Sequence, residues 1–283
     1  MPVSDAELSS LASSHDIIAL GMAADEVRRA KHGARTTFVR VADVGAEVGA
    51  AVACPATAGE LRIVGAPASA RAAVERVAEV AAQRAGAPVS GYSLADLEAL
   101  AARESVPLRA VLEQLRAAGL ELVAEAPLDL LRDAQRSIEE VNIAGLGLAR
   151  TTLDETPPGD VMEHLRSVAA LQRRVAVIRA FAPLARRSNP ALPTTGYDDV
   201  KRVALARVLL ADIPTIQVDW QRHGPKLAQV ALTVGADDLD AVSADEDGTE
   251  GVRRSAMETV RRNILAAGQE PVERNGRFDP VGR

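Results

Sequence analysis

The chain has 283 residues, of which 47% are hydrophobic and 25% charged, and its net charge at pH 7 is −6. This is a water-soluble globular composition, and the negative charge together with only 2% aromatic residues argues against nucleic-acid binding through phosphate contacts or base stacking. No run approaches the roughly 18 apolar residues of a membrane span, no secretory signal is evident, and a single cysteine, Cys54, excludes an intrachain disulfide. We therefore expect a cytoplasmic protein without a membrane or nucleic-acid partner.

Hydrophobic periodicity and turn residues predict alternating strands and helices along the chain. The predicted strands cover residues 36–41, 60–65, 87–90, 141–148, 174–181 and 216–218. The predicted helices cover residues 16–31, 69–85, 93–103, 107–119, 128–139, 158–173, 195–211, 225–234 and 252–267. Such alternation implies an α/β fold with a parallel sheet, and six or so units suit a partial (β/α)6 TIM-like barrel. With no repeat and no linker, residues 1–283 are expected to form one domain.

The most informative stretch runs from Pro193 to Ala241. Thr195 or Gly196 can cap the first helix of this stretch, and Pro225 suits the first turn of the second, where its missing N–H is tolerated. The acidic residues 235–240 then read as a turn, and the acidic run that continues to Asp247 reads as a solvated segment rather than a calcium site.

Four motifs carry a family signal: the LARVLLADIPTIQ run, the WQRHGPKLAQVAL helix, the GADDLD turn and the PVERN sequence near the end of the chain. Together they resemble the radical-SAM enzymes that make menaquinone through futalosine, and their deazaflavin-synthase relatives. Residues 15–35 resemble the N-terminal helix of that family, and residues 193–283 resemble its C-terminal region. The resemblance implies a radical-SAM-type barrel.

The chain departs from that family after the first predicted strand. The resemblance implies a C-x3-C-x2-C motif there, whose three thiolates hold three irons of a [4Fe–4S] cluster and leave one for S-adenosylmethionine. Residues 42–55 contain Cys54 alone and no histidine. We therefore expect no cluster, no S-adenosylmethionine and no other cofactor or metal on this chain. The family's glycine loop is also replaced, by Leu122-Val-Ala ahead of Glu125.

Ligands of parallel barrels bind in the loops at the carboxyl ends of the strands. The ligand-binding candidates expected there are Glu125, Asn142, Glu155, Asn189 and His223. Glu155, in a segment similar to the family's HxET loop, is the candidate catalytic residue. Asp43 and Arg186 also belong to these loops. For each candidate the plainer interpretation is a solvated loop residue or a helix cap, and Trp220 reads as a core ring.

Two functional hypotheses follow. The first is a non-catalytic member of the family that pairs with an active radical-SAM enzyme of the menaquinone pathway in a hetero-oligomer, or that binds a small-molecule nucleoside intermediate. The second is an enzyme that performs non-radical chemistry on a futalosine-like nucleoside, with Glu155 as general base. A protein that keeps only the scaffold is a third, structural alternative.

Overall fold

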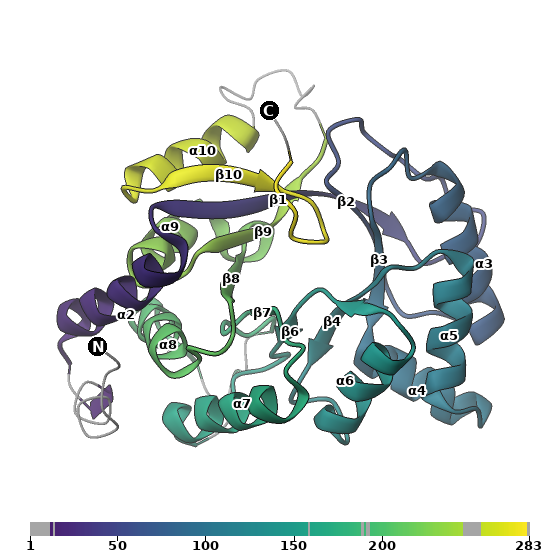
Figure 1. Ribbon diagram of the computed structural model, residues 1–283, viewed down its shortest axis with the longest axis horizontal. Coiled ribbons are helices and arrows are strands. Elements are labelled where there is room, and N and C mark those ends of the chain that lie inside the picture. Colours follow the sequence, from purple (N-terminus) through teal and green to yellow (C-terminus); the bar gives the residue numbers. More distant parts are fainter. Residues whose placement is uncertain are drawn as a thin grey trace.

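The computed structural model of the chain describes residues 12–13, 15–157, 159–187, 190, 193–245 and 256–281 (Figure 1). Its strands are β1 (Arg35–Gly45), β2 (Glu60–Val64), β3 (Val89–Ser93), β4 (Leu122–Pro127), β5 (Gly147–Leu148), β6 (Thr151–Thr152), β7 (Ala180–Phe181), β8 (Thr215–Asp219), β9 (Asp238–Ser243) and β10 (Glu270–Arg274). Its helices are α2 (Ile17–His32), α3 (Ala70–Gln83), α4 (Leu94–Glu104), α5 (Leu108–Ala118), α6 (Ala134–Ile143), α7 (Val161–Val175), α8 (Gly196–Leu209), α9 (Trp220–Thr233) and α10 (Ala256–Ala266).

All the paired strands of the described barrel are parallel. Their order is β1-β2-β3-β4-β6-β7-β8-β9, and the ring closes because β9 pairs with β1. The short strand β5 pairs with the first part of β4, ahead of β6. The α/β barrel predicted from strand–helix alternation is confirmed, and it closes over eight strand positions where about six were expected.

Strand β1 organises the closure because it is long enough to hold three partners. Its first half, from Arg35 to Val39, pairs with β10, and its second half, from Val41 to Gly45, pairs with β2. The strand β10 therefore adds the end of the chain to the barrel wall. The PVERN motif, expected only as a family terminus, is this strand.

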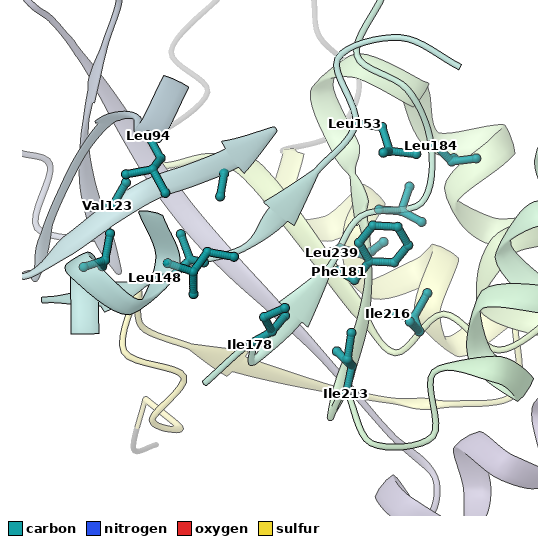
Figure 2. Close-up of a cluster of buried hydrophobic side chains, with 14 of the residues drawn as sticks. Leu94, Val123, Leu148, Leu153, Ile178, Phe181, Leu184, Ile213, Ile216 and Leu239 are labelled. Atoms are coloured by element: carbon teal, nitrogen blue, oxygen red, sulfur yellow. The ribbon is translucent and has the colours of Figure 1, made fainter. Parts of the chain in front are cut away.

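The helices surround the barrel, and the hydrophobic core fills the layer between them and the strands (Figure 1). Figure 2 shows part of this core, in which Phe181 of β7 lies beside Ile216 of β8 and Leu239 of β9. Helix boundaries follow local chemistry. Thr195 and Asp198 form a reciprocal capping box at the start of α8, so the cap is Thr195, one of the two candidates that the sequence offers, and not Gly196.

Two predicted strands are wrong over most of their length. The segment 141–148 begins as the last turn of α6, in which Ile138 and Val141 continue the buried helical stripe, and only Gly147 and Leu148 are extended. Likewise α7 continues to Val175, so only the end of the predicted strand 174–181 pairs in the sheet. In both places the helical spacing of buried residues continues past the position where the sequence was interpreted as the end of the helix.

The acidic turn expected at residues 235–240 is also wrong, because its second half is strand β9. Asp237, Asp238 and Asp240 are buried, with 3%, 0% and 1% of their surface exposed. Arg28 of α2 is buried too and donates to Asp25 and to the Gly33 carbonyl. The charge of a residue alone does not predict its exposure here, because a carboxylate or guanidinium can be buried when it is fully paired.

Among the described helices, none has the length and apolar character needed to cross a membrane.

Candidate ligand-binding mouth of the barrel

Asp240 of β9 is the centre of an ion-pair network inside the barrel. Its two oxygens each accept a 2.9 Å hydrogen bond from Arg62 of β2. Arg150, which follows β5, reaches the same carboxylate at 2.5 Å. Because β9 and the β5–β6 segment lie on distant parts of the ring, this contact crosses the lumen. The two arginines hold the pKa of Asp240 well below its usual range despite its burial.

The Arg62 guanidinium has a second carboxylate partner, Glu60, beside Asp240. The Glu60 carboxylate accepts from Arg62 at 2.9 Å and from the Ser90 hydroxyl at 2.5 Å. All three side chains are buried. The neighbouring carboxylates of Asp240 and Glu60 raise the pKa of Arg62 against the effect of its burial, so the guanidinium stays charged.

A second layer lies around Asp238. Its carboxylate accepts two hydrogen bonds from Arg274 of β10, at 2.6 and 2.7 Å, and one from Gln217 of β8 at 2.7 Å. The Phe278 ring stacks on the Arg274 guanidinium at 3.9 Å. We call the pairs of Asp238 and Asp240 with Arg62, Arg150 and Arg274 the lumen network.

The mouth of the barrel carries a further pair. Glu125, at the carboxyl end of β4, contacts Arg186 from the loop after β7 and lies 3.6 Å from Arg150. The Glu125 side chain is 10% exposed, and its Oε2 atom accepts no hydrogen bond. Burial lowers the pKa of both arginines, and their like-charged neighbours Arg62 and Arg222 add to this. Glu125 therefore neutralises two crowded guanidiniums.

Asp43 stands at the same end of β1 and is exposed. Partial desolvation raises the pKa of its carboxyl, and the nearby carboxylates of Asp240 and Glu60 raise it further, against Arg62 and Arg150. The structure thus gathers Asp43, Glu125 and Arg186 around one mouth, as expected for residues of strand-end loops.

The segment between β1 and β2 is tied to helix α3. Arg76, fully buried on α3, donates to the carbonyls of Gly45 at 2.8 Å and Ala50 at 2.9 Å. It also pairs with Glu79 at 2.8 Å, and Glu79 accepts the Gly49 N–H at 3.0 Å. A side chain that holds two carbonyls and a partner carboxylate fixes residues 45–50 as a closed turn.

A comparison with known protein families finds one family that resembles part of this barrel. The model of the CofH/MqnC C-terminal region matches residues 183–282, which include β8, α9, β9 and β10. Over residues 183–282 the chain is similar to this family. The CofH/MqnC C-terminal region thus supplies both buried aspartates of the lumen network, whereas Arg62 and Arg150 lie outside it.

Curated relatives extend the likeness beyond the CofH/MqnC C-terminal region. Aminodeoxyfutalosine synthase of Thermus thermophilus is 26% identical over 69% of this chain and 61% of its own length. Cyclic dehypoxanthine futalosine synthase of Streptomyces coelicolor is 28% identical over 66% of the chain and 53% of its own. A 5-amino-6-(D-ribitylamino)uracil–L-tyrosine 4-hydroxyphenyl transferase of Methanopyrus kandleri is 28% identical over 74% and 65%. The chain spans about half to two thirds of the length of these relatives.

Solved structures agree on the fold. Methylornithine synthase superposes with a TM-score of 0.66 at 14% identity, covering 96% of this chain and 94% of its own. The hydrogenase maturase HydG of Carboxydothermus hydrogenoformans gives 0.61 at 12% identity, over 96% and 76%. At such identities the likeness shows the architecture alone, which is a parallel α/β barrel.

Glu155 lies outside the lumen network. Its side chain is 42% exposed and pairs with Arg187 at 3.3 Å, and its N–H donates to Asp129. Arg187 also pairs with Asp154, and Glu155 and Arg187 form an isolated β-bridge. These contacts join the loops that follow β6 and β7. The catalytic role expected for Glu155 stays a prediction, tested by turnover of a futalosine-type compound and its loss in Glu155→Gln.

The remaining candidates are scattered. His223 is half-buried on α9, one turn after Asp219 at the end of β8, and burial lowers its pKa. Asn142 is exposed near the end of α6, where it borders Arg179 and Asp212 ahead of β7 and β8, away from the mouth. The expectation that Asn142 follows a strand is therefore wrong. Asn189 lies outside the described residues. Trp220 is buried at the start of α9, as predicted.

Sequence reasoning missed Arg62, Arg150 and Asp240. A signal for Arg62 existed, because charged Glu60 and Arg62 alternate with apolar Leu61 and Ile63 in a short strand. Two charges on one face of a buried strand call for partners inside the barrel.

Proposed function

We propose that this chain is a non-catalytic barrel protein that forms a complex with an active radical-SAM enzyme of the futalosine pathway. Its C-terminal family region and its relatives support the pathway. The absence of a thiolate set after β1 supports the non-catalytic role.

The observation that carries the proposal is the segment between β1 and β2. A [4Fe–4S] cluster of the radical-SAM kind needs three cysteine thiolates from this place in the fold. The segment holds Cys54, which is the single cysteine of the chain, and no histidine. Arg76 and Glu79 also fix its first residues against α3. The residues present do not fit the cluster, so we assign it no role here.

The lumen network supports the same conclusion. Arg62 and Arg150 extend into the barrel and share the Asp240 carboxylate, and Arg274 pairs with Asp238. Charges that neutralise one another within the fold need no ligand to balance them. A non-catalytic barrel of this kind contributes to a pathway through the enzyme or the small molecule that it binds.

Mixing the purified chain with an aminodeoxyfutalosine synthase and a cyclic dehypoxanthine futalosine synthase of the same organism tests the proposal. Sedimentation velocity should show a complex larger than either component with at least one of the two enzymes. Failure to form a complex with both enzymes, at concentrations of tens of micromolar, would contradict it.

A second candidate function is binding of a pathway nucleoside at the mouth. The observation that favours it is the unsatisfied Oε2 atom of Glu125, buried beside Arg150, where a ligand N–H or O–H can bond. Calorimetry with futalosine should detect binding that weakens about tenfold or more in Glu125→Gln. Glu155→Gln, which changes an outer carboxylate, is the control and should bind like the unaltered chain.

A further inference from the structure

The segment that follows β10, residues 275–281, turns back toward the barrel as a short loop (Figure 1). Asn275 organises the reversal, because its Oδ1 atom accepts the N–H groups of Arg277 at 2.8 Å and Asp279 at 3.0 Å. The Asn275 N–H itself donates to the Asp279 carbonyl at 2.9 Å. An asparagine that bonds the backbone two residues further on is typical of a tight turn. We call residues 275–281 the strap.

The strap is held by residues that each lie directly before a barrel strand. The Gly276 N–H donates to the carbonyl of Gly59, ahead of β2, at 3.0 Å. The Arg277 guanidinium donates twice to the carboxylate of Glu121, ahead of β4, at 2.6 and 2.9 Å. The Arg277 carbonyl accepts from Arg179, ahead of β7, at 3.0 Å. Because the barrel strands are parallel, all three positions lie at the amino end of the barrel, opposite the mouth.

Phe278 of the strap contacts two guanidinium groups. Its ring centre lies 3.9 Å from Arg274, which pairs with Asp238 of β9, and 5.1 Å from Arg179. The strap therefore contacts β9 through Arg274, in addition to the residues ahead of β2, β4 and β7. These four are alternate strands around the ring. A segment held at four alternate strands lies across the opening at the amino end of the lumen.

The beginning of the strap is fixed by two glycines. A Cβ atom at Gly59 would lie 2.9 Å from the carbonyl oxygen of Arg274, and one at Gly276 would lie 3.0 Å from the Glu60 side chain. Only glycine permits two backbone segments to approach so closely without displacing a neighbour. The strap is thus anchored at Gly276, next to the lumen network.

The outer part of the strap is held less firmly. The Arg277 side chain is 42% exposed and that of Glu121 is 26% exposed, and exposed ion pairs contribute little to stability. Phe278 has a φ of 68°, a left-handed conformation that is unfavourable for a bulky residue. A cavity of about 290 Å³ borders Phe278 and Arg274, so the ring is not close-packed on every side.

We propose that the strap is a latch at the amino end of the barrel, anchored at Gly276 and releasable at Phe278. When closed, it covers the pair of Arg274 with Asp238, and Arg274 is 2% exposed. When released, it admits small solutes to that pair from the end opposite the mouth, while the barrel stays folded. Release breaks a ring contact and an exposed ion pair, whereas unfolding removes the whole core. The PVERN motif supplies both the covered arginine and Asn275, which forms the turn.

Labelling of arginines in the full chain with a small dicarbonyl reagent, read at each residue by mass spectrometry, tests the latch. Phe278→Ala removes the ring that covers Arg274, so labelling of Arg274 should rise at least about tenfold over the unaltered chain. Arg207, fully buried on α8, is the internal control and should stay unlabelled. Tyr197→Ala removes another ring that lies beside a cation, Lys201, and should leave the labelling of Arg274 unchanged.

Hydrogen exchange of the unaltered chain gives a second measurement that needs no variant. The strap amides of Arg277, Phe278 and Asp279 should exchange at least about a hundredfold faster than the amides of β9, because the latch opens without unfolding. Unchanged labelling of Arg274 in Phe278→Ala, or strap amides as protected as those of β9, would overturn the latch. An equal rise in the labelling of Arg274 and Arg207 would also overturn it, because the ring would then support the whole barrel.

Discussion

The lumen of the barrel and the outer rim of its mouth use the same chemistry in different surroundings. Inside, Asp240 and Arg62 are almost fully buried, and each has several partners. At the rim, Arg187 is 62% exposed and pairs with Asp154 and Glu155. A buried pair cannot lose one member without stranding the other, whereas water and salt replace an exposed partner. The inner pairs therefore depend on one another within the fold, whereas the outer pairs join loops.

Asp240→Asn should have the largest effect. It leaves Arg62 and Arg150 sharing Glu60 and Glu125 in a buried space, and breaking a buried pair costs about 3–5 kcal/mol. Urea unfolding followed by circular dichroism measures the loss. Asp154→Asn, at the rim, is the control and should change the unfolding free energy far less. Equal losses of unfolding free energy in the two variants would contradict the distinction between the lumen and the rim.

Low pH should remove the contribution that the ionised Asp240 makes to the free energy of unfolding. Its pKa in the folded chain lies below its ordinary value of 3.8, so its contribution to stability is complete above pH 3.8. The contribution is lost as the pH falls from there toward the lowered pKa. The difference in unfolding free energy between the unaltered chain and Asp240→Asn should therefore narrow as the pH is lowered from about 4 to about 2. A difference that stays constant over this range contradicts the assignment.

Arg76→Met tests the tie between α3 and the β1–β2 segment. Removing the guanidinium leaves the Gly45 and Ala50 carbonyls without their donor, which should cost about 1–3 kcal/mol. Hydrogen exchange of residues 45–50 should accelerate more than that of the rest of the barrel. Arg71→Met, exposed on the same helix, should leave both measurements unchanged. Uniform acceleration over the whole chain would mean that Arg76 supports the fold in general.

The smallest effect is expected at the rim. Arg187→Gln removes the pairs with Asp154 and Glu155, yet it should leave the urea midpoint unchanged within error because Arg187 is 62% exposed and Glu155 is 42% exposed, so water can replace the lost pairs. Repeating the measurement at high salt should remove any remaining difference. A large, salt-independent loss would show that the rim is as important to the fold as the lumen.

The sequence predicts the helices and the barrel class well because local periodicity and capping determine them. The capping box at Thr195 depends on near neighbours, and so does the kink of α9 at Gly224, directly before the predicted helix start at Pro225. Helix α9 itself begins earlier, at Trp220. The lumen network is not readable in the same way. Asp240 and Arg62 are 178 residues apart, so nothing local shows that an acidic run is a buried strand.

The candidate site shows the same limit. Glu125 was found because it matches a family motif, and the structure gives it Arg150 and Arg186 as neighbours. Asn142 was misplaced because the predicted strand was the end of a helix. Short strands such as β5 and β7 carry too few residues for their period to be recognised.

Iron analysis tests the central claim most directly. The chain would be purified anaerobically and incubated with ferrous iron, sulfide and reductant, and iron and acid-labile sulfide would then be measured per chain. With one cysteine and a fixed β1–β2 segment, we expect well below one iron per chain and no cluster signal in electron paramagnetic resonance. About four irons per chain, with a matching amount of sulfide, would contradict the non-catalytic role.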